Sequence, residues 1–119
     1  MSPARRQKGA ATGAARRLPA VVLALTAWLA VPAAWAAEHE IEVADSAFRP
    51  AVIHVRAGDT VTWVNREKRT SHSVAFDASG QESERFFPGE RWSHTFTAAG
   101  EHAYHCGPHP EMTGKVVVE

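Results

Sequence analysis

From residue 37 onward, apolar and polar residues alternate in short runs that turn residues separate. In "EIEVA" the alternation places Ile41 and Val43 on one face, and in "AVIHV" it places Ile53 and Val55 together. Alternation over about four to eight residues is typical of a strand with one buried face. Similar patterns predict further strands at residues 60–65, 71–76, 91–96, 101–106 and 115–119.

Turn signals divide these strands at regular intervals. "AGD" at Gly58 marks a tight turn, and "DASGQ", "FPG" and "AAG" separate the later strands. No window after residue 37 has convincing helical periodicity. The pattern predicts an all-β domain, a Greek-key β-sandwich of about seven to eight strands.

The first 36 residues differ from the rest in composition. Five of the thirteen lysines and arginines lie before residue 18, and the apolar run that follows ends in Ala34-Trp35-Ala36. This order is typical of a secretory signal peptide with its cleavage site. We predict a cleaved signal at residues 1–36, a mature domain at residues 37–119 and a periplasmic location. The sequence leaves open the choice between the general and the twin-arginine export routes. An uncleaved membrane anchor is the alternative to cleavage.

Charge is unevenly distributed along the chain. The formal net charge is zero, yet residues 37–119 carry eight basic and all thirteen acidic side chains, a net charge of −5. Nucleic-acid binding depends on a basic patch or stripe, and the domain has none. We therefore expect no nucleic-acid partner. We also expect a monomer with no stable membrane anchor after cleavage.

The stretch "YHCGPHPEM" holds the only cysteine of the chain, Cys106, with His109 and Met112 at three-residue intervals after it. One cysteine cannot form an internal disulfide, and a bound metal would help to stabilise so small a domain. The alternative is structural, because buried cysteines and gap-filling methionines are common in cores. A loop that prolines tighten can bring three side chains together around one point. His72 is the predicted fourth donor, since loops at one end of a sandwich converge.

The donor types favour a particular metal. Two imidazoles and a thiolate with a weak axial thioether describe a blue-copper site. Zinc is the rival, but it prefers several Cys or His ligands, or an open water position. We predict one type 1 copper, cycling between Cu(II) and Cu(I), with the ligands His72, Cys106, His109 and Met112.

Two segments, "GDTVTWVNREKRTSHSVAF" and "YHCGPHPEMTGKVVVE", resemble the ligand-bearing segments of the cupredoxins, blue copper proteins that include the amicyanins, plastocyanins and pseudoazurins. The Cys-x2-His-x2-Met loop is similar to that of amicyanins. The resemblance implies a β-sandwich that transfers single electrons in the periplasm and is not an enzyme. It also implies a redox enzyme as donor, which in the amicyanins is an amine dehydrogenase, and a cytochrome c or similar protein as acceptor. Electrons would leave through the ring edge of His109.

The sequence departs from this family pattern at two positions. Ser73 stands where many cupredoxins have an asparagine that braces the cysteine loop, and its side chain has a shorter reach. Glu111 stands where amicyanins have an aromatic residue. A negative charge beside the electron exit changes the docking surface, so the sequence leaves open a donor other than the methylamine dehydrogenase of amicyanins.

Two other functions compete with electron transfer. Periplasmic copper delivery or storage is the main alternative, although exposed Met-rich or His-rich tracts are missing. A catalytic cupredoxin needs a second copper centre, for which the domain has no ligands. The remaining five histidines are predicted to be solvent-facing or hydrogen-bonded structural residues: His39, His54, His94, His102 and His105.

Overall fold

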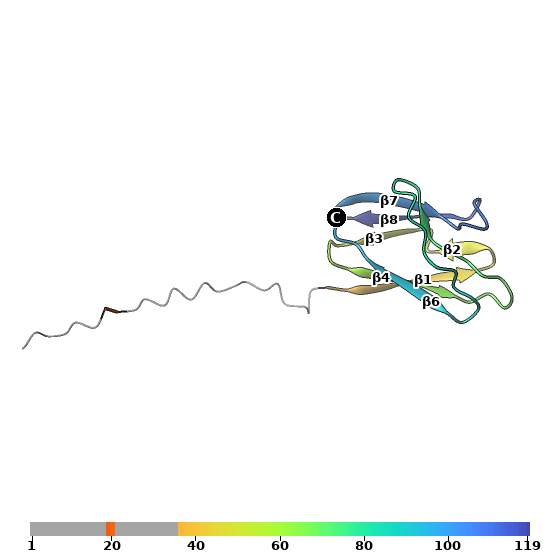
Figure 1. Cartoon of the computed structure of the whole chain (residues 1–119), viewed down its shortest axis with the longest axis horizontal. Helices are drawn as coiled ribbons and strands as arrows, with labels where there is room; N and C mark the ends of the chain where they lie inside the picture. Colours follow the sequence, from red (N-terminus) through yellow and green to blue (C-terminus); the bar gives the residue numbers. More distant parts are fainter. Residues whose placement is uncertain (1–18, 21–35) are drawn as a thin grey trace, which may run out of the picture.

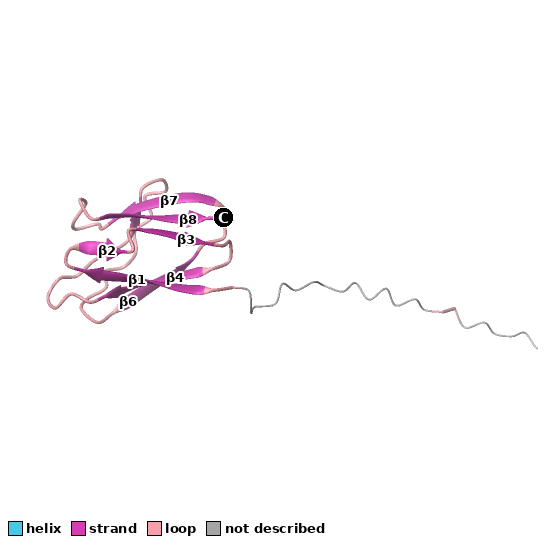
Figure 2. Ribbon diagram, turned by 180° about the vertical axis from the view of Figure 1, so that it is seen from behind, coloured by secondary structure: helices cyan, strands magenta, loops and turns pink. Residues whose placement is uncertain are grey.

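The computed structural model describes residues 19–20 and 36–119, and the second of these ranges folds into a β-sandwich. Figure 2 shows its strands, in magenta, in two layers that loops connect. The all-β prediction is confirmed. The strands are β1 (Glu38–Ala44), β2 (Ala47–Arg49), β3 (Val52–Val55), β4 (Thr60–Asn65), β5 (Ala75–Phe76), β6 (Arg91–Thr95), β7 (Gly100–His105) and β8 (Thr113–Val118).

Each layer is a mixed sheet of four strands. The first has the order β2-β1-β4-β6 and the second the order β3-β8-β7-β5. β1 pairs with β4, and β3 with β8, in parallel, whereas all other neighbours are antiparallel. The last strand of the chain therefore lies inside its sheet, between β3 and β7. Within the described ranges, no helix has the length and apolar character needed to cross a membrane.

The predicted strand at 71–76 is shorter than expected. Only β5 pairs with a neighbouring strand there, and His72 forms an isolated bridge with Phe86. β2 was not predicted. The segment before β5 is therefore held by the long loop that follows it, and this arrangement fixes the backbone around His72.

Aromatic rings fill the space between the sheets. Trp63 and Tyr104 are fully buried, and their rings meet edge to face with centroids 5.4 Å apart. Phe48 packs against Tyr104 at 4.9 Å. Trp92 lies partly buried beside Trp63, with ring centroids 5.4 Å apart. Trp63 is therefore a central residue of the core, and Trp92 packs against the core from its edge.

The two ends of the sandwich are formed by different segments of the chain. Glu119 lies beside the turn that precedes β4, where the N–H of Ala57 donates to its carbonyl, and the start of β7 pairs with the end of β8. Figure 1 accordingly shows the C-terminus opposite the β7–β8 loop. We call the end with residues 66–72 and 106–112 the loop end, and the end with Ala37 and Glu119 the terminal end.

Candidate metal centre

Asn65, the last residue of β4, organises the chain that leads to His72. Its buried amide Nδ2 donates to the carbonyls of Thr70 and Phe86 at 2.8 and 3.0 Å. Its Oδ1 accepts from the N–H of Glu67 at 2.9 Å. Backbone hydrogen bonds in both directions, at 3.1 and 2.9 Å, then join His72 to Phe86. The His72 ring is fully buried in a fixed backbone setting.

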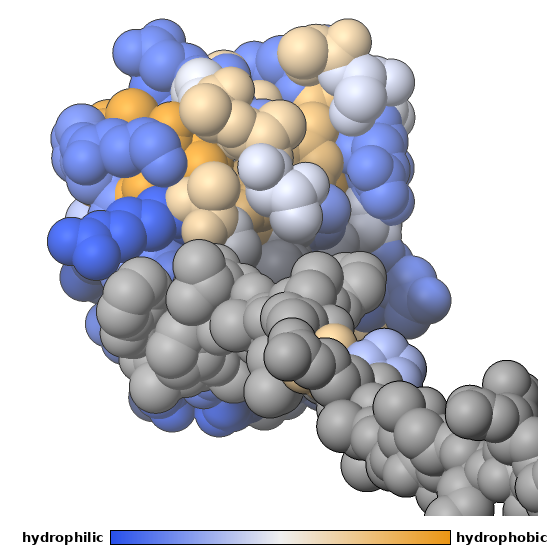
Figure 3. Space-filling view, turned by 90° about the vertical axis from the view of Figure 1, so that its left-hand side faces the viewer, coloured by the Kyte–Doolittle hydropathy of each residue, from blue (hydrophilic) through white to orange (hydrophobic). Residues whose placement is uncertain are grey.

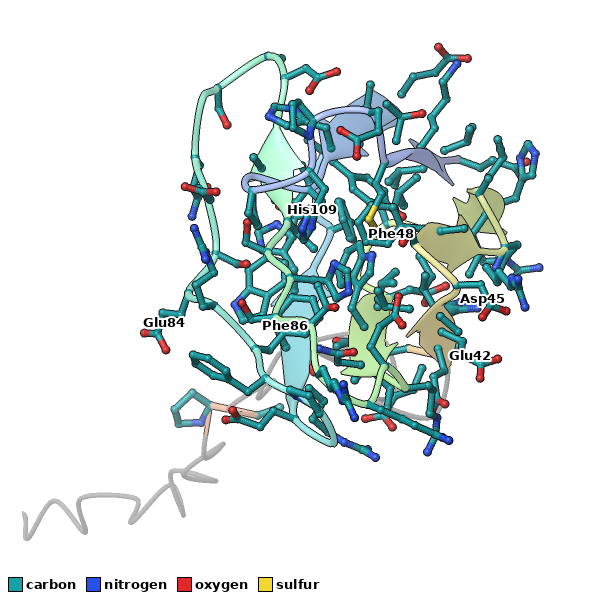
Figure 4. All side chains as sticks on the ribbon, turned by 90° about the vertical axis from the view of Figure 1, so that its right-hand side faces the viewer. Glu42, Asp45, Phe48, Glu84, Phe86 and His109 are labelled. Carbon is teal, nitrogen blue, oxygen red and sulfur yellow. The ribbon has the colours of Figure 1, made fainter. Side chains whose placement is uncertain are left out.

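The loop between β7 and β8 closes on itself through backbone hydrogen bonds. The N–H of Cys106 donates to the carbonyl of Met112 at 2.9 Å, and the N–H of Met112 donates to His109 at 2.9 Å. The N–H of His109 donates to the carbonyl of Cys106 at 3.2 Å. Cys106 and Met112 are buried members of the core cluster, and His109 is half-buried at the loop end. The loop thus brings the donor atoms of Cys106 and His109 close together, with Met112 buried in the same loop, and Figure 4 shows the labelled His109 at this end.

The structure brings His72, Cys106 and His109 together, as predicted, with donor atoms that all lie within 4.8 Å of one another. The Nδ1 atoms of His72 and His109 each lie 3.5 Å from the Sγ of Cys106. Nitrogen and sulfur atoms bound to one metal ion at about 2.0–2.3 Å and at trigonal angles lie about 3.5–3.8 Å apart. The three donors therefore have the spacing of a metal site.

Burial sets the protonation of these donors. It lowers the pKa of His72, although the neighbouring Glu67 carboxylate acts in the opposite direction, and so favours the neutral ring that a metal ion binds. Burial raises the pKa of the Cys106 thiol, while the N–H groups of Ser73 and His109 partly offset this effect. A metal ion that binds Cys106 as the thiolate must therefore displace a proton.

Ser73 and Glu82 brace the cysteine loop. Ser73 reaches the cysteine loop: its Oγ accepts from the N–H of Gly107 at 3.0 Å and donates to Glu82 Oε1 at 2.8 Å. The shorter serine side chain reaches the loop because the backbones of Ser73 and Gly107 lie close together here. A Cβ atom on Gly107 would lie 1.6 Å from Glu82 Oε1 and 2.6 Å from Ser73 Oγ. The glycine therefore makes room for the pair that braces its own loop.

Sequence reasoning missed two carboxylates beside the donors. Glu82 lies nine residues beyond Ser73 in an exposed loop, and no spacing rule connects the two. Glu67 Oε1 lies 3.6 Å from the buried His72 Nε2, an atom without a hydrogen-bond partner. The same oxygen accepts from the N–H of Ser46 at 2.8 Å. Glu67 is thus fixed next to the ring edge that faces away from Cys106.

Known proteins share this fold and donor set. The chain matches the family described as Cupredoxin-like domain over residues 19–118. It is 45% identical to the amicyanin of Paracoccus denitrificans over 85 residues, which cover 66% of this chain and 63% of that protein, slightly less than two thirds of its length. It is 39% identical to amicyanin-alpha of Methylorubrum extorquens over 103 residues, covering 82% of this chain and 85% of the relative.

The chain is also similar to plastocyanins and to solved amicyanin structures. The chloroplastic plastocyanin of Tetradesmus obliquus is 36% identical over 84 residues, covering 60% of this chain and 58% of the relative. A reduced Cu(I) form of an amicyanin variant superposes with a TM-score of 0.66 at 40% identity, covering 69% of this chain and 82% of that one. An oxidised amicyanin variant gives a TM-score of 0.65 at 40% identity, covering 67% and 80%.

Copper is the cofactor that fits this donor set. Two imidazole nitrogens and a thiolate suit copper in a trigonal arrangement, and a methionine follows in the same short loop. From its sequence match, its fold and these donors together, the chain belongs to the cupredoxin family.

Proposed function

We propose that this protein is a type 1 blue copper protein that carries single electrons between exported redox proteins, with copper bound by His72, Cys106, His109 and Met112. The observation that carries the proposal is the equal 3.5 Å separation of the two Nδ1 atoms from Cys106 Sγ. The names of the relatives, amicyanin and plastocyanin, support it. Four protein donors around the copper would leave no open position for a substrate, which favours a carrier role over an enzymatic one.

The ligand residues are held so that little has to move during electron transfer. Copper supplies the one-electron couple between Cu(II) and Cu(I). Cys106 and His72 are fully buried, which keeps water from the site, and the backbone hydrogen bonds of residues 106–112 fix the loop. Donors already in place before an electron arrives need no reorganisation when it does. Burial and the closed loop therefore favour fast exchange.

The loop end offers the route for electrons. Of the three clustered donors, only His109 is not fully enclosed, and it occupies the centre of the face in Figure 4. Lys68 and Arg69 are exposed near this end and form no ion pair with any residue of the described ranges. They complement an acidic partner surface, and steering by charge speeds transient encounters. We propose a dehydrogenase of the amine-oxidising class as donor and a cytochrome c as acceptor.

Export and processing are part of this proposal. We propose that a signal peptide at residues 1–36 directs the chain to the periplasm and is removed after Ala36, which leaves residues 37–119. Except for residues 19–20 and 36, this segment lies outside the described part. The intact mass of the periplasmic protein tests the processing, and recovery of the uncleaved chain in the membrane fraction would contradict it.

We expect the purified protein to bind one Cu(II) and turn blue, because a short Cu(II)–thiolate bond gives intense visible charge transfer. Titration followed by absorption and electron paramagnetic resonance tests the site, and stopped-flow mixing with oxidised cytochrome c tests the carrier role. A colourless complex with ordinary tetragonal resonance parameters would overturn the type 1 assignment. A blue protein that gives up copper to a chelator but no electrons to cytochrome c would favour copper delivery.

Removal of the Ser73 brace should alter the copper site without unfolding the protein. In Ser73→Ala the N–H of Gly107 loses a hydrogen bond of about 0.5–1.5 kcal/mol, which loosens the loop behind Cys106, and we expect a shifted reduction potential. Glu82→Gln keeps the acceptor oxygen and removes only the charge, so it separates the hydrogen bond from the electrostatic effect. Voltammetry measures both, and Glu84→Ala is the control, an exposed carboxylate on the same loop. Equal potentials in Ser73→Ala and wild type would show that the brace has no influence.

A further inference from the structure

The terminal end holds a second arrangement of nitrogen donors, in Ala37-Glu38-His39. Cleavage after Ala36 would make His39 the third residue of the mature chain. A free α-amine, the next two backbone nitrogens and an imidazole at position three can surround a metal ion in one plane, the geometry that Cu(II) and Ni(II) prefer. We propose that processing creates a Cu(II)- and Ni(II)-binding site at the amino terminus, separate from the copper site at the loop end. The proposal rests on the processing given under the proposed function.

Asp59 already gathers two of these donors. The backbone nitrogen of Ala37 donates to Asp59 Oδ1 at 2.9 Å, and His39 Nε2 lies 2.9 Å from Asp59 Oδ2. The future α-amine and the imidazole therefore lie on the same side of the strand. The ring contacts Asp59 through Nε2. Its other nitrogen, Nδ1, has no hydrogen-bond partner among the described residues. Nδ1 is the nitrogen that closes a chelate ring with the backbone nitrogen of the same histidine.

The edge of β1 leaves room for a metal ion at this point. β2 pairs with β1 only from Glu42 onward, so the first residues of β1 have β4 as their single strand neighbour. The carbonyl of Ala37 accepts from the N–H of Thr60 at 3.1 Å and so faces β4. Since backbone groups of successive residues alternate in direction, the N–H of Glu38 points to the open side. The backbone nitrogen of His39 must leave the ladder, and the site should bind more weakly than the same sequence in a free peptide.

The surroundings of the site suit a divalent cation. The His39 ring borders a hollow of about 230 Å³ in which the carboxylates of Asp59 and Glu119 face one cationic side chain, Arg56; the other lining residues are Ala37, His54 and Val55. Figure 3, which faces the terminal end, shows hydrophilic residues on both sides of an apolar area. Binding releases one proton from the α-ammonium group and one from each backbone nitrogen of Glu38 and His39, all to solvent. The resulting anionic nitrogens offset the charge of the metal ion.

The two metal sites are far enough apart for their spectroscopic signals to be measured separately. β4 begins beside Ala37 and ends at Asn65, next to the ligand loops, and six strand residues span about 20 Å. The thiolate of the loop end gives a blue, trigonal copper signal, whereas four nitrogens give a tetragonal one without thiolate charge transfer. Filling the second site should leave the blue band unchanged.

The test uses protein secreted from the full-length chain, with its intact mass measured and the loop end loaded with one equivalent of Cu(II). A second equivalent of Cu(II), or Ni(II) in a parallel sample, is then followed by paramagnetic resonance, visible absorption and calorimetry. We expect a second, tetragonal copper signal with nitrogen coupling. His39→Gln should abolish it, because this change removes the imidazole. Glu38→Pro should abolish it as well, since proline has no backbone N–H to release.

His54→Gln is the matched control, because it removes an imidazole from the same hollow and should leave the second signal intact. A second copper that survives Glu38→Pro would overturn the proposal and indicate a site made of side chains. Absence of a second signal in protein that starts at Ala37 would also overturn it. A mass that places the terminus elsewhere would overturn it too, yet the blue band of the loop end would persist, so this failure is distinct from failure of the electron-carrier function.

Discussion

Cys106→Ser should leave the protein colourless with Cu(II). The blue colour of a type 1 site comes from charge transfer between thiolate sulfur and Cu(II), and a serine hydroxyl has neither the sulfur nor an accessible anionic form. Cys106 is fully buried, with both histidine Nδ1 atoms 3.5 Å from its sulfur, so no other residue can replace it. We expect complete loss of the blue band, together with weaker copper binding. Absorption and metal analysis of the same sample measure both.

His105→Gln is the control for this substitution. His105 precedes the cysteine, but its Nδ1 pairs with Asp77 Oδ1 at 2.6 Å, so its ring points away from Cys106, in line with the alternation of side chains along a strand. This variant should stay blue with an unchanged band. A blue Cys106→Ser protein, or a colourless His105→Gln protein, would show that the ligand assignment is wrong.

Trp63→Ala should have the largest effect on stability. Trp63 is fully buried, and its ring packs against Tyr104, Trp92 and Phe96. Its Nε1 has no hydrogen-bond partner in the described part of the chain, so truncation loses mainly apolar contacts. The cost should be about 3–5 kcal/mol, a large share of the roughly 5–15 kcal/mol that stabilises a typical domain. Urea denaturation of the metal-free protein measures the change.

Copper should partly rescue this variant. A ligand that binds only the folded state stabilises it by about 2.7 kcal/mol at a concentration a hundred times its dissociation constant. The copper-loaded Trp63→Ala protein should therefore unfold at higher urea than the metal-free form. Trp92→Ala is the matched control, because Trp92 is only partly buried and its loss should cost less. Equal costs for the two tryptophans would contradict the view that Trp63 is the centre of the core.

Local patterns predicted the fold where they were strong. β4 has the predicted bounds because its β-branched residues and Trp63 favour a strand and no other element in this segment. β2 was missed because three residues between turn signals are too few to show a period. The segment before β5 looked like a strand, yet His72 pairs with Phe86, and a contact between loops has no periodic signal.

The residues of the metal site likewise include some that the sequence predicts and some that it does not. Cys106, His109 and Met112 follow from spacing within one loop, and His72 follows from the convergence of loops at one end of a sandwich. The brace could not be predicted, because it depends on how closely the backbones of Ser73 and Gly107 approach. The choice of Glu82 as the partner of Ser73 likewise depends on the path of an exposed loop.

The central position of β8 has a consequence for the order of folding. Val52 pairs with Lys115 and Val55 with Val118, so the second sheet joins the middle of the chain to its last residues. Contacts between residues so far apart in sequence form slowly, because the intervening chain must first lose conformational entropy. A chain that emerges from a ribosome or a membrane channel with its amino terminus first has to wait for its final strand. Until then β3 and β7 have no shared neighbour, and the loop that carries Cys106 is anchored on one side only. The binding site for copper can therefore be completed only after β8 has been released.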